Sequence, residues 1–126
     1  MIDTIISYGH KLPGIHSEIF LAQVGGATNR IANDATAYPH RDIQFVMNVH
    51  TRWLEANDDA MCVDWARDFY RATKPFATGG AYMNFISEGD DSVESAYGDN
   101  ALKLAAVKQK YDPDNILRTN LNITPS

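Results

Sequence analysis

The chain has 126 residues, enough for one domain with a hydrophobic core or for part of a larger domain. Sixteen acidic and eleven basic residues give a formal net charge of −5, and the basic residues are scattered along the chain. This balance argues against a nucleic acid as the main partner, because phosphate binding calls for a basic surface.

Cysteine content and hydropathy exclude further classes of protein. Cys62 is the only cysteine, which excludes an internal disulfide and a cysteine-based metal site. No apolar run approaches the roughly 18 residues of a membrane span, so we expect no membrane partner. Residues 1–14 carry Asp3 and lack the basic start and apolar core of a signal peptide. If Met1 is the native start, a cytoplasmic location is therefore favoured.

The first half of the chain predicts a short helix and two strands. A helix over about residues 3–8 ends at Gly9. Residues 17–24 read as a strand with both faces at least partly buried. Residues 42–50 alternate well enough to predict a strand with one face in the core and His50 on the solvated face.

The second half predicts two helices and an extended tail. Residues 57–59 offer an N-cap for a helix whose apolar residues recur at helical spacing and whose end is marked by Pro75. Residues 79–86 read as extended and residues 87–100 as an acidic loop. A last helix runs over about residues 99–110 and ends at Asp112-Pro113. The fold class predicted is α+β: part of an antiparallel sheet flanked by helices, with a C-terminal helix and an extended tail.

When only their spacing is considered, few side chains indicate a catalytic or binding role. Cys62 lies on the apolar stripe of its helix, which favours a packed thiol over a nucleophile. No histidine is paired at a metal-ligand spacing, so we expect no metal site. Tyr38, His40 and Arg41 crowd a turn at Pro39. They either line a pocket or bond to loop carbonyl groups.

Tyr82 and Asn84 form a further candidate pair. In an extended segment two residues separated by one position lie on the same face, so the phenol and the amide would point together. A phenol can exchange a proton with a reacting hydroxyl group, and an amide can both donate to and accept from the edge of a heteroaromatic ring. Ordinary burial of a strand explains the same spacing.

The C-terminal third carries a series of fixed spacings: Tyr82-Met83-Asn84, Tyr97-Gly98-Asp99-Asn100, Lys108, Tyr111-Asp112-Pro113-Asp114-Asn115, Arg118 and Asn122-Ile123. This series resembles the berberine-bridge-enzyme-like C-terminal segment of FAD-linked oxidases of the vanillyl-alcohol-oxidase type. Upstream, residues 25–42 resemble the end of the substrate domain of these enzymes, with a Gly-Gly-Ala and a Pro-His-Arg. Leu117 stands where the family usually has phenylalanine, and Ala101 stands where an aromatic residue often follows.

The resemblance implies a domain plan and a set of roles. Residues 1–76 would be the end of a substrate-domain-like region and residues 77–126 the berberine-bridge-enzyme-like segment, with the FAD-binding domain absent from the sequence. Tyr82 would be the catalytic phenol, and Asn84 and Asn115 would contact FAD. Tyr38, His40 and Arg41 would line or brace the substrate pocket.

Two functions follow from the resemblance. In the first, the chain is the C-terminal portion of an FAD-dependent oxidoreductase that acts on an alcohol, amine or sugar by hydride transfer to flavin. FAD would bind only together with an FAD-binding domain supplied in cis or in trans. In the second, the chain is a non-catalytic domain that uses its uncovered apolar surface to bind a partner or to form a homodimer.

Overall fold

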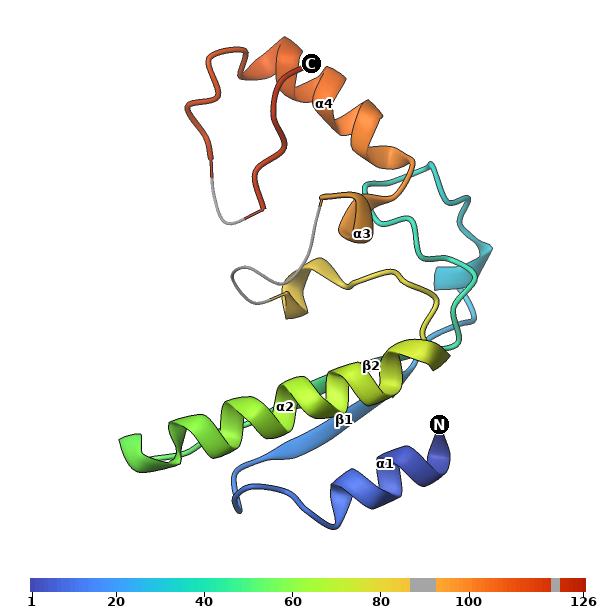
Figure 1. Ribbon diagram of the computed structural model, residues 1–126. Coiled ribbons are helices and arrows are strands. Elements are labelled where there is room, and N and C mark those ends of the chain that lie inside the picture. Colours follow the sequence, from blue (N-terminus) through green and yellow to red (C-terminus); the bar gives the residue numbers. More distant parts are fainter. Residues whose placement is uncertain (87–92, 119–120) are drawn as a thin grey trace. The chain divides into compact units, whose positions relative to one another are not determined.

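The computed structural model describes residues 1–86, 93–118 and 121–126 (Figure 1). Its helices and strands are α1 (Ile2–Gly9), β1 (Glu18–Gln23), β2 (Phe45–His50), α2 (Asp59–Thr73), α3 (Val93–Tyr97) and α4 (Asn100–Tyr111). In the described residues, one helix precedes an antiparallel pair of strands and three helices follow it, which confirms the α+β class. The chain divides into two compact units: a sheet unit (1–23 and 45–78) and a tail unit (24–44 and 79–126).

Strands β1 and β2 form a two-stranded antiparallel sheet in which Glu18 pairs with His50 and Gln23 with Phe45. The predicted strands are confirmed, but the predicted burial was wrong for several residues. Phe20 is 42% exposed, Leu21 51% and Phe45 54%. Two strands offer little area for burial, so large side chains stay exposed wherever no helix of the same unit covers them.

Helices α1 and α2 pack against each other through aromatic rings. The ring centroid of Tyr8 lies 4.9 Å from that of Phe69 and 6.0 Å from that of Trp65. Phe69 and Cys62 are fully buried, so the predicted apolar stripe of α2 is the small core of the sheet unit, and the packed thiol is confirmed. Burial raises the pKa of Cys62, and the carboxylates of Asp58 and Asp59 raise it further.

The start of α2 differs from the prediction. A 3-10 turn over Ala56–Asp58 leads directly into the helix, and the Asp58 side chain makes no capping hydrogen bond. Asp58 has φ −92° and ψ −4°, whereas a capping residue adopts an extended backbone that turns its side chain towards the first free N–H groups. The carboxylate of Asp59 instead accepts a hydrogen bond from the indole of Trp53.

The tail unit corrects two predictions. Residues 79–86 are not a continuous extended segment, because Met83–Phe85 form a 3-10 turn. Within the predicted acidic loop, Val93–Tyr97 form helix α3, while residues 87–92 lie outside the described residues. Glu94 and Ala96 are good helix formers, so the sequence favours a helix locally. The acidic residues around them led to the prediction of a loop.

Helix α4 is tied down at both ends. At its start, buried Asn100 donates from Nδ2 to the carbonyl oxygens of Asn33 (2.7 Å) and Thr36 (3.0 Å). At its end, Asp112 accepts hydrogen bonds from the backbone N–H groups of Ile116 and Leu117 and closes the turn that follows. The turn that follows α4 is therefore held by the side chain of Asp112, the residue that caps the helix.

Candidate active-site pocket

A shallow open pocket of about 170 Å³ lies within the tail unit. It is lined by residues from the loop before β2, the 3-10 turn and α3: Ala37, Tyr38, Tyr82, Met83, Asn84, Ala96 and Tyr97. Three of these residues, Tyr38, Tyr82 and Asn84, are site residues expected from the sequence. Tyr97, whose hydroxyl group donates to the sulfur of Met83 at 2.6 Å, was noted only as part of a family spacing.

The side chains of Tyr82 and Asn84 meet, as predicted, but for a different reason. Nδ2 of Asn84 donates to the phenol oxygen of Tyr82 at 2.9 Å. The backbone between them is a 3-10 turn, which brings the two side chains to the same side by curling the chain rather than by the alternation of a strand. The phenol is thus partnered by the amide two residues ahead of it.

Tyr38 and Phe85 hold the ring of Tyr82 from two sides. The ring centroid of Tyr38 lies 5.9 Å from that of Tyr82, with an interplanar angle of 88°. The ring centroid of Phe85 lies 5.0 Å away at 83°. Both are edge-to-face contacts, which aromatic rings prefer over a direct face-to-face arrangement. Burial raises the pKa of Tyr38, although the positive charge of Arg41 opposes the shift.

Arg41 braces the loop rather than reaching into the pocket. Its Nε donates to the carbonyl oxygen of Tyr38 at 3.1 Å and its Nη1 to that of Thr28 at 3.2 Å. Its Nη2 donates to the hydroxyl oxygen of Thr36 at 2.6 Å, and its guanidinium carbon lies 4.7 Å from the ring centroid of Tyr38. Of the two interpretations left open by the sequence, the contacts seen are those with loop carbonyl groups.

His40 joins the same loop to the segment that leads into the 3-10 turn. Its Nε2 lies 3.2 Å from the carbonyl oxygen of Ala81. Because a carbonyl oxygen can only accept, Nε2 carries the proton in this contact. Gly80 makes the approach possible, since a Cβ atom at that position would lie 2.4 Å from the imidazole ring. His40 therefore braces the pocket and does not line it.

Asn115 lies in the turn after α4, apart from the residues that line the pocket. It has φ +50°, a left-handed conformation that asparagine tolerates better than most residues. Its backbone N–H donates to the carbonyl oxygen of Asp112 at 3.0 Å, and its side-chain oxygen is enclosed with no hydrogen-bond partner among the described residues. These contacts hold Asn115 in the turn, and its expected contact with FAD stays a prediction.

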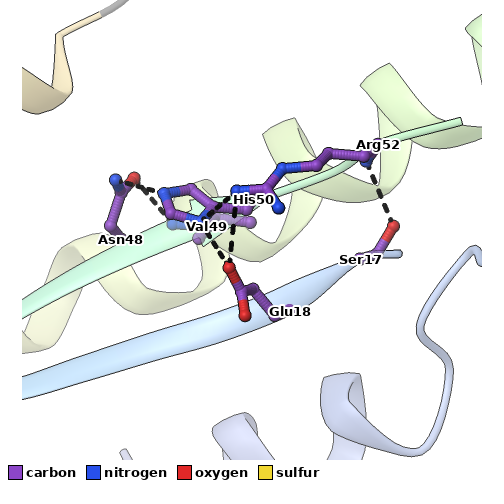
Figure 2. A network of polar contacts seen from close by, with 6 residues as sticks. All are labelled: Ser17, Glu18, Asn48, Val49, His50 and Arg52. Atoms are coloured by element: carbon purple, nitrogen blue, oxygen red, sulfur yellow. Dashed lines mark hydrogen bonds and ion pairs between the residues drawn. The ribbon is translucent and has the colours of Figure 1, made fainter. Parts of the chain in front are cut away.

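A polar network that the sequence analysis missed lies on the two-stranded sheet (Figure 2). His50 was expected to be solvated, but its Nδ1 lies 2.8 Å from Oε1 of Glu18 and its Nε2 lies 2.7 Å from Nδ2 of Asn48. Arg52 reaches the same carboxylate at 3.6 Å. The hydrogen bond to His50 lowers the pKa of Glu18. The strand register, which pairs Glu18 with His50, was the missing signal, and it cannot be read from one strand alone.

The described residues contain neither a membrane-spanning helix nor a cluster of metal ligands. No helix among the residues that the structure describes is long and apolar enough to cross a membrane. Over the same residues, no three histidine, cysteine or acidic side chains gather in a way that could hold a metal ion.

Comparison with known proteins finds a family match for the C-terminal third of the chain. Residues 81–124, which contain the Tyr82–Asn84 pair, match the family described as "Berberine and berberine like". The chain matches the C-terminal part of the berberine-bridge-enzyme-like FAD-linked oxidases. The resemblance inferred from the sequence is confirmed.

Relatives of this family align with most of the chain. An uncharacterized FAD-linked oxidoreductase of Bacillus subtilis (strain 168), YgaK, is 30% identical over 125 residues, which cover 98% of this chain and 28% of the relative. Berberine bridge enzyme-like 17 of Arabidopsis thaliana is 31% identical over 120 residues, 81% of this chain and 23% of that protein. The chain thus spans about a quarter of the length of the berberine-bridge-enzyme-like relatives it matches.

Solved structures agree on the fold. Wild-type BBE-like 1 of Physcomitrella patens superposes with a TM-score of 0.88 at 23% identity, over 99% of this chain and 27% of that one. A glycopeptide hexose oxidase, DBV29, solved in complex with teicoplanin, superposes with a TM-score of 0.81 at 28% identity, over 98% of this chain and 29% of that one.

The pocket residues fit one part of the FAD that gives these relatives their name. Asn84 keeps one N–H group and its side-chain oxygen free of the bond to Tyr82, and the neighbouring aromatic rings are flat and apolar. Such a surface suits the edge of a flat heteroaromatic ring. None of the residues that line the pocket is positively charged, so this surface does not suit the diphosphate.

Proposed function

We propose that the chain is the C-terminal part of an FAD-dependent oxidoreductase and acts together with an FAD-binding domain, in cis or in trans. The observation that carries the proposal is the Tyr82–Asn84 pair, which lines the pocket and lies in the segment that matches the family. Two of the relatives are named as FAD-linked oxidoreductases, and the chain covers about a quarter of their length. The substrate class we propose is an alcohol, an amine or a sugar.

In this function Tyr82 handles the proton and the chain shapes one wall of the site. When bound, FAD supplies the two-electron acceptor for the hydride that leaves the substrate carbon. After its phenol has given its own proton to solvent, Tyr82 takes the proton that leaves the substrate hydroxyl or amino group and later releases that proton to solvent as well. Asn84 is the proposed cofactor contact of the chain. Tyr38 lines the substrate side of the pocket, and His40 and Arg41 hold its loop in place.

Exposed apolar side chains support docking on a partner. In the tail unit, the neighbouring side chains of Ile116 and Leu117 are 75% and 77% exposed. Neighbouring exposed apolar side chains mark an interface more often than scattered ones do. An FAD-binding domain is the proposed occupant. The same observation favours the second candidate function, in which the chain forms a homodimer or binds another protein and has no catalytic role.

The deciding experiment combines the chain with an FAD-binding part taken from a relative such as YgaK. The proposed function expects a yellow complex with bound flavin that is reduced by a substrate of the class above. Tyr82→Phe keeps the flavin and lowers the rate of reduction about 10²-fold or more, which is the usual effect of losing a general acid or base. A colourless homodimer that takes up no flavin under any pairing would instead establish the second candidate.

A further inference from the structure

We infer that Asn84 is a positioning residue for the Tyr82 phenol. This inference rests on the proposed function for its chemical meaning, while its geometry stands independently. Nδ2 of Asn84 lies 2.9 Å from the phenol oxygen, a distance typical of a good hydrogen bond. The family resemblance implied only a contact between Asn84 and the flavin. The contact seen is with the neighbouring phenol.

The backbone fixes the position of the Asn84 amide relative to the phenol oxygen of Tyr82. The N–H of Phe85 donates to the carbonyl oxygen of Tyr82 at 2.8 Å, and the N–H of Ile86 donates to that of Met83 at 3.3 Å. These two bonds close the 3-10 turn between Tyr82 and Ile86. Because the turn fixes the separation of the two side chains, the amide reaches the phenol oxygen from a defined direction.

The direction of the hydrogen bond has a chemical consequence. An amide N–H occupies one lone pair of the phenol oxygen, so the hydroxyl hydrogen of Tyr82 must point away from Asn84. If the phenol loses that hydrogen, the same N–H faces a negative oxygen. Hydrogen bonds to a charged oxygen are about twice as strong as neutral ones, so the bond from Asn84 strengthens as negative charge develops on the phenol oxygen during the reaction.

The rings complete the positioning. Tyr38 and Phe85 contact the Tyr82 ring edge-on from separate segments, at 5.9 Å and 5.0 Å between centroids. Ring contacts restrain the plane of the phenol but place no partner on its oxygen. Among the described residues, Asn84 is the side chain seen donating to that oxygen. Its loss should therefore change the chemistry of Tyr82 without removing the pocket.

A first experiment tests the bond in the full 126-residue chain by NMR. One of the side-chain amide protons of Asn84 should shift when Tyr82→Phe removes the acceptor. Asn100, whose amide donates to the carbonyl oxygens of Asn33 and Thr36, is the internal control and should not shift. Amide signals of Asn84 that are identical in the wild type and in Tyr82→Phe would overturn the inference.

A second experiment measures kinetics in the complex with the FAD-binding part. Asn84→Asp keeps the shape of the side chain but replaces the donor by an acceptor, and Asn84→Leu removes both. Each should lower kcat about tenfold, with KM unchanged and the pH profile of kcat displaced, as expected when a hydrogen bond to a developing charge is lost. Asn84→Asp should lose at least as much as Asn84→Leu, because its carboxylate repels a negative phenol oxygen.

The outcomes separate the two proposals. A higher KM with kcat unchanged would show that Asn84 binds substrate and would overturn the positioning role. Loss of flavin from both variants, together with Asn84 amide signals that do not change in Tyr82→Phe, would assign Asn84 to the cofactor alone and would overturn it as well. If the wild-type complex carries no flavin, the proposed function fails, and the NMR result on Asn84 and Tyr82 still decides whether the phenol is positioned.

Discussion

Lys108 and Asp112 lie one helical turn apart at the end of α4, and their ion pair is largely shielded from water. Their side chains are only 15% and 11% exposed. Asp112 also accepts from the N–H groups of Ile116 (2.8 Å) and Leu117 (3.0 Å), and Lys108 donates in addition to the carbonyl oxygen of Leu117. One carboxylate thus joins the helix to the tail that follows it.

This pair predicts acid sensitivity of the tail unit. The hydrogen bond from Lys108 holds the pKa of Asp112 below its ordinary value, and the backbone donors lower it further. Because the folded pKa lies below the unfolded one, the stabilisation is fully present above about pH 4 and is lost as pH falls through the folded pKa. Asp112→Asn should lower the melting temperature by several degrees at pH 7 and reduce its fall towards pH 2.

The matched control for that measurement is Asp114→Asn, which changes the charge equally at an exposed position of the same turn. Its melting temperature should stay close to that of the wild type at pH 7. Thermal unfolding followed by circular dichroism at several pH values supplies the comparison. Equal melting curves for the two variants would show that the Lys108–Asp112 pair does not hold the tail.

Phe69 carries the core of the sheet unit. It is fully buried and contacts the rings of Tyr8 and Trp65, with centroids 4.9 Å and 5.6 Å away. Phe69→Ala should lower the free energy of unfolding by about 3–5 kcal/mol, because it leaves a cavity between α1 and α2. Met61→Ala on the exposed side of the same helix should cost well under half as much. Urea unfolding measures both, and equal losses would contradict the assignment of the core.

Gly80 is required by the close approach of His40. A Cβ atom at position 80 would lie 2.4 Å from the imidazole, so Gly80→Ala should displace the ring and break its bond to Ala81, at a cost of about 1–3 kcal/mol. Gly9→Ala, where no atom lies within 4 Å, is the control and should not destabilise the protein. In the double variant with His40→Ala the steric penalty should disappear. A penalty that persists there would point to a backbone cause instead.

A variant of Arg41 distinguishes a residue that braces the loop from one that binds the substrate. Arg41→Lys retains the charge but loses the fork of donors to the carbonyl groups of Tyr38 and Thr28, so amide exchange over residues 28–41 should accelerate about tenfold. Arg30→Lys, an exposed change in the same loop, should leave the exchange rates unaltered. Exchange unchanged in Arg41→Lys, together with a raised KM in the complex with an FAD-binding part, would show that Arg41 binds substrate.

Local patterns of the sequence predicted most elements correctly. Helix α2 and strand β2 appear at the expected residues, because helix and strand periods are properties of neighbouring residues, whereas the alternating burial expected for β2 does not appear. The fixed spacings from Tyr82 to Ile123 were sufficient to recognise the family, since they do not depend on knowing which segments meet. The helix over Val93–Tyr97 and the 3-10 turn at Met83–Phe85 were missed, because both are short and lack a full period.

What only the tertiary structure decided is which side chains meet. The sequence by itself determined the fold class, the apolar stripe that buries Cys62 and the residue types around the pocket. It left open whether Arg41 and His40 line the pocket, and it placed His50 in solvent. Contacts between segments distant along the chain, such as Glu18 with His50, settle such questions. They depend on strand register and loop closure, which no local pattern encodes.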